Sequence, residues 1–415
     1  MDISQIKPEI FNLAVDAEDR VEDIFKDIDE ISRDNTMRVM QAFQNNKVSE
    51  ACFAGTTGYG YDDLGRDTLD KIYAEVFGAE KAIVRIGLVN GTHAISCALF
   101  SLCAPGEKIL SVSGKPYDTL RRAIGIEGED FGSLKFYGIE YDEVDFNENG
   151  DPDIPLIKEK LKDESIKAVI MQRSCGYGAR RTLSIEDIRQ VCKVIKSVRD
   201  DVNIFVDNCY GEFTETLEPT HVGVDLIAGS LIKNPGGGIA PAGGYIAGKA
   251  ELVERAAFRM TSPGIGGEVG PSLGNSRLLY QGFFMAPHIV AQALKSAVFA
   301  ASMMEFMGME TYPSSSAPRS DIIQRISLKT GENMKKFCLG IQAGAPVDSY
   351  VSPEPWAMPG YDCDVIMADG SFIQGSSIEL SADGPFKEPY NVFLQGGLTY
   401  ESARLGIMMA ASLMI

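Results

Sequence analysis

Two side chains with reactive chemistry follow short apolar runs in the middle of the chain. Asp207 ends the run 204–206, and Lys233 comes a few residues after a second run, 224–228. Short apolar runs bounded by glycine and aspartate are typical of buried strands in an α/β sheet. Ligands of such sheets bind at the carboxyl ends of the strands. We therefore expect Asp207 and Lys233 to face one crevice.

A lysine and a carboxylate in one crevice predict a site for pyridoxal phosphate. A lysine removed from water loses proton affinity, and its neutral amine can form a Schiff base with the aldehyde of this cofactor. A carboxylate opposite the pyridine nitrogen keeps that nitrogen protonated, which makes the ring an electron sink. The alternative for Lys233 is an exposed loop lysine, which the presence of Asp207 and Ser230 argues against.

The sequence around these residues resembles the fold-type I pyridoxal-phosphate enzymes, and most closely the cystathionine lyase and methionine γ-lyase group. Within that group it is similar to the aluminium-resistance branch, and the resemblance covers nearly the whole chain. It implies the α/β fold of aspartate aminotransferase, with a mostly parallel, seven-stranded sheet in a large domain and a small α+β C-terminal domain. We expect a helical arm at 1–50, the large domain at 51–310 and the small domain at 311–415. The arm packs either on its own chain or on a neighbouring subunit.

The cofactor phosphate is expected at a strand–turn–helix segment, residues 82–102. Backbone N–H groups at a helix start bind anions, and glycine lets a phosphate approach the backbone. By resemblance, Gly91 and Thr92 bind the phosphate together with Ser230, which matches the serine of the family's Ser-x-x-Lys motif. Ile232 replaces the family's usual threonine, so one phosphate bond is missing or comes from elsewhere.

Two aromatic residues compete for the place against the cofactor ring. Tyr117 matches by spacing the tyrosine that stacks on the ring in the lyase group. An aromatic face there holds the ring flat and helps to exclude water. His93 could instead stack on the ring or bond a substrate group, or it could be a helix N-terminal histidine without a role. Both residues are kept as cofactor-binding candidates.

The segment before the first helix of the large domain departs from the family pattern. The lyases have a Tyr-x-Arg-x-Gly segment that reaches the cofactor phosphate of the adjacent subunit. Here Tyr61 and Gly65 match, but Asp63 stands at the arginine position and Arg66 lies three residues further on. The resemblance implies a homo-oligomer, a dimer or tetramer, with a shared active site. Tyr61 and Tyr117 are the candidates for assisting proton transfer, and ordinary loop packing is the alternative for Tyr61.

Two arginines are candidates for binding the substrate. Arg404 lies in a segment, 395–406, that resembles the one whose arginine binds the substrate α-carboxylate in the lyases. A guanidinium fork matches a carboxylate with two hydrogen bonds. The alternative for Arg404 is a structural salt bridge. Arg173 or Ser174 would replace the asparagine of the lyases' Ser-x-x-Asn-Pro loop, which this sequence lacks.

The predicted activity is that of a pyridoxal-phosphate-dependent carbon–sulfur lyase of the cystathionine β-lyase or methionine γ-lyase type. Lys233 would hold the cofactor and, once freed, remove the Cα proton of an amino-acid substrate. Loss of a thiol from Cβ or Cγ then yields a 2-oxo acid and ammonia. Another reaction of the same cofactor, γ-replacement or transamination, would use the same lysine and aspartate. A metal-tolerance protein with an acidic surface and a non-catalytic pocket is an alternative of a different class.

Composition limits the remaining possibilities. The 415 residues carry a net charge of −19, which argues against nucleic acid and anionic membranes as partners. The eight cysteines form no Cys-x-x-Cys pair, and with three histidines a metal site is not expected. We find no signal-like start and no apolar run of the length that spans a membrane, so we expect a cytoplasmic protein. Gly243 to Lys249 matches a P-loop pattern, but Ala250 replaces its Ser/Thr.

Overall fold

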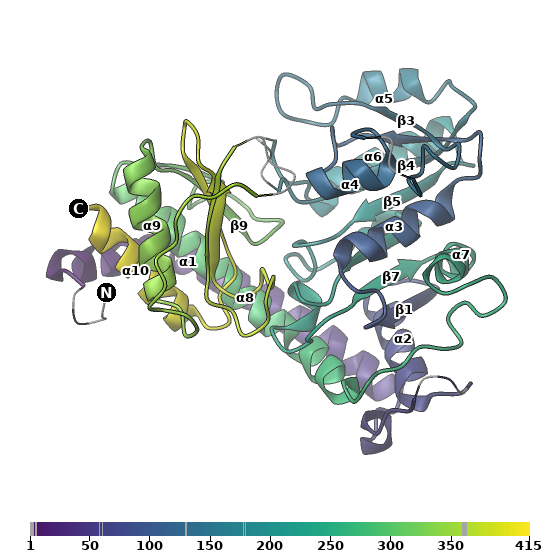
Figure 1. Ribbon diagram of the computed structural model, residues 1–415, viewed down its shortest axis with the longest axis horizontal. Coiled ribbons are helices and arrows are strands. Elements are labelled where there is room, and N and C mark those ends of the chain that lie inside the picture. The colour runs from purple at the N-terminus through teal and green to yellow at the C-terminus, as the bar shows by residue number, and fades with distance from the viewer. Residues whose placement is uncertain are drawn as a thin grey trace. The chain divides into compact units, whose positions relative to one another are not determined.

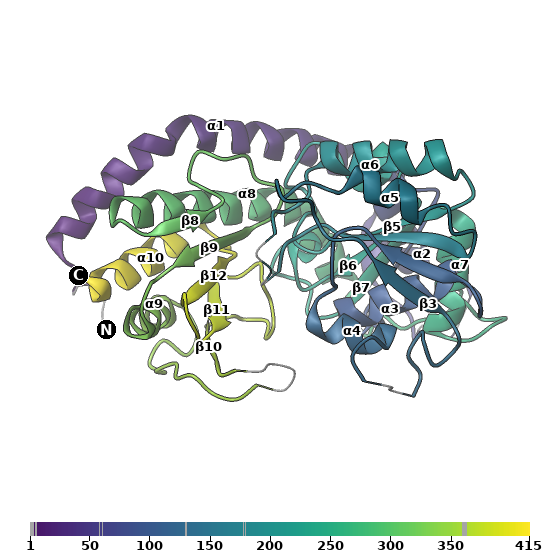
Figure 2. The same cartoon turned by 90° about the horizontal axis from the view of Figure 1, so that it is seen from above.

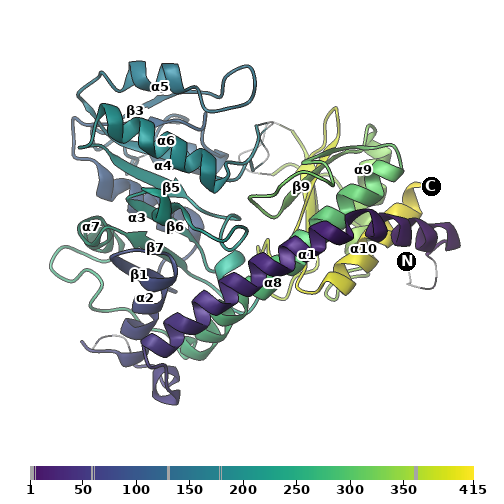
Figure 3. The same ribbon diagram turned by 180° about the vertical axis from the view of Figure 1, so that it is seen from behind.

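The structure is a computed structural model that describes residues 4, 6–57, 59, 61–128, 131–176, 178, 180–358 and 363–415. The chain forms two compact units, residues 1–35 with 285–415 (unit 1) and residues 36–284 (unit 2). The divisions fall inside the two long helices α1 (Pro8–Asn45) and α8 (Ser276–Phe306), which run side by side (Figures 1, 2 and 3). These divisions differ from the expected boundaries near 50 and 310, because each of the two helices has residues in both units.

Unit 2 is built on a seven-stranded sheet in the order β1-β7-β6-β5-β4-β2-β3. The pairs from β3 to β6 are all parallel, whereas β7 runs antiparallel to both of its neighbours. This is the mostly parallel sheet that the sequence predicts. The strands are β1 (Lys81–Arg85), β2 (Lys108–Ser111), β3 (Glu140–Glu143), β4 (Ile166–Gln172), β5 (Asn203–Asp207), β6 (Leu226–Ser230) and β7 (Gly244–Gly248).

Helices of unit 2 cover this sheet and connect its strands. They are η2 (Glu50–Phe53), α2 (Leu64–Val76), α3 (Gly91–Leu102), α4 (Asp118–Ile124), α5 (Ile154–Lys160), α6 (Ile185–Val198), η3 (Pro219–Val222), η4 (Asn234–Gly236) and α7 (Ala250–Met260). Apolar residues of α3 and α7 form one buried cluster with residues of the central strands. Helix α6 begins with a capping box formed by Ser184 and Asp187.

Unit 1 contains a five-stranded antiparallel sheet in the order β10-β11-β12-β9-β8. Its elements are β8 (Glu310–Tyr312), β9 (Ile323–Ser327), α9 (Gly331–Ala343), β10 (Val365–Asp369), β11 (Ser381–Pro385), β12 (Asn391–Gln395) and α10 (Tyr400–Met414). The N-terminal part of α1 and the C-terminal part of α8 share its apolar core. The predicted α+β character of the C-terminal part of the chain is confirmed.

Three local segments bear on the reading of the sequence. Residues 134–137 form hydrogen-bonded turns, and Gly138 adopts a φ of +81° before β3 begins at Glu140. Helix α8 is long and apolar enough to cross a membrane, but 72% of its apolar window is buried inside the protein, as is typical of a core helix. Gly244 to Gly248 is itself strand β7 and leads into α7, so this segment is not a P-loop.

Candidate active site

Lys233 and Asp207 lie at the carboxyl ends of two neighbouring parallel strands. Asp207 is the last residue of β5, and Ser230 is the last residue of β6. Lys233 lies three residues after Ser230, and its Nζ lies 3.6 Å from the centre of the Tyr210 ring. Asp207 and Lys233 are close enough for each charge to shift the pKa of the other. The structure therefore brings together the two residues that the strand pattern singles out.

The Lys233 side chain holds its proton more strongly than burial alone would predict. Burial lowers the pKa of Lys233, but the acidic groups of Tyr210, Cys209 and Asp207 outweigh burial and raise that pKa above its ordinary value. Loss of water lowers the pKa of this amine as expected, but in the chain by itself the neighbouring groups outweigh that effect. A charged lysine attracts an anionic cofactor, and it must lose its proton before the amine can react.

Asp207 is a buried carboxyl group for which the effect of burial outweighs that of its cationic neighbours. It is 5% exposed, and burial raises its pKa more than Lys233 and the N–H of Cys209 lower it. The only hydrogen bond to its carboxylate recorded among the described backbone groups comes from Cys209 N, at 3.1 Å. The ionised form of such a carboxyl group is stabilised when a positive charge lies against it. Asp207 thus fits the role of partner to a protonated pyridine nitrogen.

The start of α3 forms a cradle that fits a phosphate group. Asn90 caps the helix by accepting a 2.8 Å hydrogen bond from His93 N, and the first N–H groups of a helix have no partner within it. Gly91 stands so near the end of β6 that an added Cβ would lie 3.1 Å from Cβ of Ser230. A larger residue at this position would crowd Ser230, so glycine favours the close approach of the start of α3 to the end of β6.

Tyr117 and His93 both belong to the surroundings of this cradle. The Tyr117 hydroxyl lies 3.1 Å from Thr92 Oγ1, and its backbone N–H donates to Gln172 at 3.1 Å. Burial, together with the nearby Asp207, raises the pKa of Tyr117. His93 Nδ1 accepts from Val89 N at 3.3 Å, and burial with the nearby Arg259 charge lowers its pKa. A neutral imidazole and a neutral phenol are both suited to stack on a ring, so the choice between them stays open.

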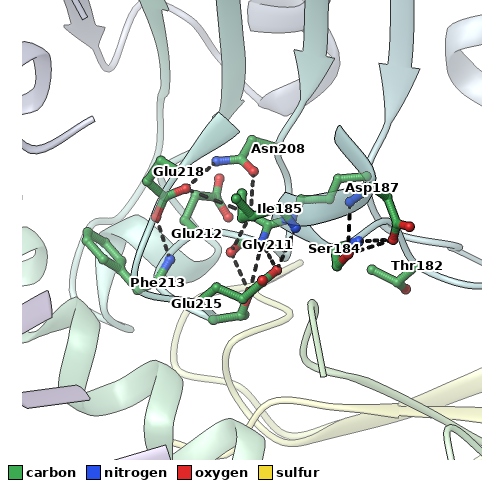
Figure 4. Close-up of polar contacts among 12 residues, drawn as sticks. Thr182, Ser184, Ile185, Asp187, Asn208, Gly211, Glu212, Phe213, Glu215 and Glu218 are labelled. Atoms are coloured by element: carbon green, nitrogen blue, oxygen red, sulfur yellow. Dashed lines mark hydrogen bonds and ion pairs between the residues drawn. The ribbon is translucent and has the colours of Figure 1, made fainter. Parts of the chain in front are cut away.

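Arg173 belongs to a buried structural network. It is 0% exposed, and its Nη1 donates to Asn208 at 2.9 Å and to the Gly211 carbonyl at 2.8 Å. Its Nη2 donates to Glu215 at 2.9 Å, and Glu218 lies 3.8 Å from Nη1. Figure 4 shows Asn208, Gly211, Glu215 and Glu218 gathered in this network. The structure contradicts the expectation that Arg173 binds substrate, because the protein itself surrounds and uses its guanidinium.

Two further predicted site residues, Arg404 and Tyr61, are described by their own surroundings. Arg404, in unit 1, donates from Nε and Nη2 to both oxygens of Glu18, at 2.8 and 2.9 Å. The guanidinium of Arg404 is thus paired with a carboxylate of the same chain, as in the structural salt bridge given above as the alternative. Tyr61 is 71% exposed, so its contact with a neighbouring subunit stays a prediction. Arg66 is 5% exposed and does not project from the surface as a residue that reaches another subunit would.

Sequence reasoning missed two residues near Lys233. Tyr210 places its ring against the Lys233 ammonium from a backbone with a φ of +72°. Glu212 is fully buried, and burial raises its pKa to about 8. Both belong to the loop that follows Asp207. The sequence signal that could have found them is a tyrosine and a glutamate within five residues of the aspartate that ends β5.

Comparison with known proteins agrees with this site. The sequence profile described as "Methionine gamma-lyase" matches residues 10–415. YnbB of Bacillus subtilis, itself uncharacterised, is 49% identical over 398 residues, or 96% of this chain and 94% of YnbB. A carbon-sulfur lyase involved in aluminium resistance from Clostridium novyi has a structure with a TM-score of 0.96 and 51% identity, covering 99% of this chain and 97% of the other.

A distant likeness supports the fold. The pyridoxal-5′-phosphate-dependent protein YhfS of Escherichia coli superimposes with a TM-score of 0.62 at 16% identity, over 92% of this chain and 95% of YhfS. Similarity at this identity concerns the architecture alone, and it agrees with the predicted aspartate aminotransferase-like fold. With the family profile spanning almost every residue, the chain belongs to the methionine γ-lyase family of pyridoxal-phosphate-dependent lyases.

Proposed function

We propose that this enzyme cleaves a carbon–sulfur bond in a sulfur-containing amino acid of the cystathionine or methionine type. The products would be a thiol, a 2-oxo acid and ammonia. The observation that carries the proposal is the convergence of Lys233, Asp207 and the α3 cradle at one edge of the sheet. Lys233 is the residue that we assign as the covalent attachment point of pyridoxal phosphate.

The residues divide the work of the reaction between them. When bound, pyridoxal phosphate supplies an electron-accepting ring that stabilises negative charge at Cα of the substrate. Asp207 favours positive charge at the ring nitrogen, and Gly91, Thr92 and Ser230 hold the phosphate. Lys233 Nζ takes up the Cα proton, and the acidic neighbours that raise its pKa make it a good proton acceptor once it is neutral.

Tyr117 is our candidate for exchanging a proton with the sulfur that leaves. Its backbone is fixed by Gln172 and its hydroxyl lies beside Thr92, so the phenol is oriented before substrate arrives. Burial and Asp207 raise its pKa, which keeps it a proton donor at neutral pH. We further propose a cytoplasmic homo-oligomer, a dimer or tetramer, in which Tyr61 reaches a neighbouring site.

The visible absorption spectrum of the purified enzyme tests the assignment of Lys233. We expect a cofactor band that is lost in Lys233→Ala and kept in Lys249→Ala, a control lysine paired with Asp225 at the start of α7. Cystathionine, cysteine and methionine are then added, and 2-oxo acid and ammonia are measured. A Lys233→Ala protein that still carries covalently bound cofactor would overturn the assignment.

The products separate the proposed lyase from its alternatives. Release of a thiol, a 2-oxo acid and free ammonia in equal amounts indicates elimination, whereas γ-replacement releases no ammonia and transamination transfers the amino group to an added 2-oxo acid. Cation binding that survives in Lys233→Ala, without any turnover in the wild type, would favour the metal-tolerance alternative. Among the described residues, no group of three or more His, Cys, Asp or Glu side chains is placed to hold a metal ion, so no structural observation favours that alternative.

A further inference from the structure

A small cavity in unit 2 is lined by two buried arginines. Its volume is about 20 Å³, and residues of α2, β1, the loop at 270–272 and the first turns of α8 surround it. Figure 1 shows α2 beside β1 at the end of the large sheet. Arg66 is 5% exposed and Arg85 is 4% exposed. A space of this size holds one water-sized group. No residue that we assign to the cofactor lines it.

The Arg66 guanidinium has an edge that no described residue pairs with. Its Nε donates to Asp67 at 3.0 Å, whereas Nη1 and Nη2 are buried without a hydrogen-bond partner. Its backbone is fixed at the start of α2, where Arg66 N donates to the capping residue Asp63 at 2.9 Å. A buried charged donor without a partner is costly. The position of Arg66 therefore calls for an acceptor in the cavity.

Two further donors line the same cavity. Arg85 Nε is buried without a partner, while its Nη1 donates to Asp70 at 2.7 and 2.9 Å and its Nη2 to the Gly267 carbonyl at 2.8 Å. Ser272 Oγ is also buried without a partner. An added Cβ on Gly270 would lie 3.2 Å from Arg85 Nε, so glycine allows this loop to close on the arginine.

The chemistry of this lining favours an anion over water. No carboxylate side chain lines the cavity, and the Tyr280 hydroxyl already donates to the Gly65 carbonyl at 2.7 Å. A water molecule could accept from two of the donors, but its own hydrogens would find only the hydroxyl oxygens of serine residues and Tyr280 as side-chain acceptors in the lining. An oxyanion only accepts, and the planar Nη1–Nη2 edge of Arg66 matches the two oxygens of a carboxylate or phosphate.

A larger pocket of about 300 Å³ adjoins the cavity and shares Arg85, Gly270 and Pro271 with it. Met260 and Val269 are among the residues that line this second space. We propose that Arg66, Arg85 and Ser272 form a binding site for a small oxyanion, of the carboxylate or phosphate class. An oxygen atom of the charged end enters the cavity, and the remaining atoms of the ligand lie in the adjoining pocket. This site is independent of the proposed carbon–sulfur cleavage.

Thermal unfolding of the holoenzyme tests the proposal, because bound cofactor already fills the phosphate cradle at α3. Sodium acetate, phosphate and chloride are compared at one ionic strength and pH 7. We expect a saturable rise in Tm with acetate and phosphate and a smaller rise with chloride, which cannot use both arginine nitrogens. Arg66→Gln and Ser272→Ala should weaken the apparent affinity for acetate and phosphate by about tenfold or more, a difference of about 1.4 kcal/mol.

Arg189→Gln serves as the matched control, since Arg189 lies on α6 near the surface and, among the described residues, forms its ion pair with Glu186. It should respond to each anion as the wild type does. If Arg66→Gln does not fold, Ser272→Ala decides, because it removes only a hydroxyl from the loop at 270–272. The proposal is overturned if acetate and phosphate act no more strongly than chloride, or if Ser272→Ala responds as the wild type does.

Discussion

The Tyr245 hydroxyl donates a 2.8 Å hydrogen bond to Oε1 of Glu212, while Oε2 of Glu212 is buried without a partner among the described residues. The same glutamate accepts a 2.9 Å hydrogen bond at its carbonyl from Asn234, the neighbour of Lys233. An added Cβ on Gly229 would lie 2.6 Å from Oε1. Glu212 is therefore held between strands β6 and β7 and the loop that carries Lys233 and Asn234. Because burial raises its pKa to about 8, Glu212 carries a proton at neutral pH.

Glu212→Gln should flatten the pH dependence of stability. The unfolded chain releases the Glu212 proton near its ordinary pKa of 4.5, whereas the folded chain keeps it up to about pH 8. The folded state thus binds more protons in this window, and the free energy of unfolding falls as pH rises from 5 to 8. This one group contributes a slope of at most about 1.4 kcal/mol per pH unit. Denaturant unfolding at each pH measures the slope.

Glutamine keeps the size of the side chain and can accept the Tyr245 hydrogen bond, but it does not titrate. Glu251→Gln is the control, because Glu251 is exposed and paired only with Arg255. It should leave the slope unchanged. An unchanged slope in Glu212→Gln as well would show that Glu212 is ionised in the folded protein at neutral pH.

Arg173→Gln should destabilise the protein by about 3–5 kcal/mol, the usual cost of breaking a buried ion pair from one side. The change leaves Glu218, which is fully buried, without the nearest of its cations. Arg189→Gln removes a surface ion pair with Glu186 and should cost at most about 1 kcal/mol. Denaturant midpoints compare the two. Equal losses would mean that the Arg173 network adds no more than a surface pair.

Gly211→Ala should damage the same network from its other side. An added Cβ would lie 2.5 Å from Arg173 Cδ and 2.6 Å from its Nη1, and a fully buried arginine cannot move aside. We expect a loss of about 1–3 kcal/mol, which is typical of overpacking. The double variant Gly211→Ala with Arg173→Gln should lose less than the sum of the two single changes, because they disturb one contact. Additive losses would contradict this.

Tyr210→Leu should lower the pKa of Lys233. The Tyr210 ring face and hydroxyl both favour the ammonium, and an aromatic face alone contributes about 0.5–2 kcal/mol to a nearby cation. Added pyridoxal phosphate should therefore attach to the apoenzyme at a pH lower by about one unit. Tyr210→Phe keeps the ring face and should shift this pH less. A shift to higher pH in Tyr210→Leu would contradict the role of Tyr210.

The strand ends could be predicted from sequence because short apolar runs fix both the sheet and its carboxyl edge. Asp207 and Lys233 followed from that rule, whereas Ser230 followed from the resemblance to the family's Ser-x-x-Lys motif. The direction of Tyr210 could not be predicted, since it depends on a left-handed backbone at that residue. The burial of Arg173 depends on residues 35 to 45 positions later in the chain, and the Glu18–Arg404 contact spans 386 positions. Local patterns carry no information on such pairings.

The last prediction separates the structural role of Arg404 from substrate binding. Arg404 and Glu18 are each about three-quarters buried at their side chains, with 25% and 29% exposed. Burial raises the pKa of Glu18, but Arg404 and Tyr400 outweigh this and lower it. The pair thus stabilises the folded state above the ordinary pKa of the carboxyl group and loses this contribution as pH falls through the lowered value.

Glu18→Gln and Arg404→Gln should therefore cost similar amounts of stability at pH 7, about 0.5–1 kcal/mol, and little at low pH. The double variant should lose no more than either single variant, because the two changes remove one interaction. If Arg404 acts only through Glu18, KM for the amino-acid substrate should stay the same in both single variants. A large rise in KM in Arg404→Gln, with none in Glu18→Gln, would show that Arg404 binds the substrate carboxylate. Both variants break the same ion pair, so only a contact between Arg404 and the substrate would make their KM values differ.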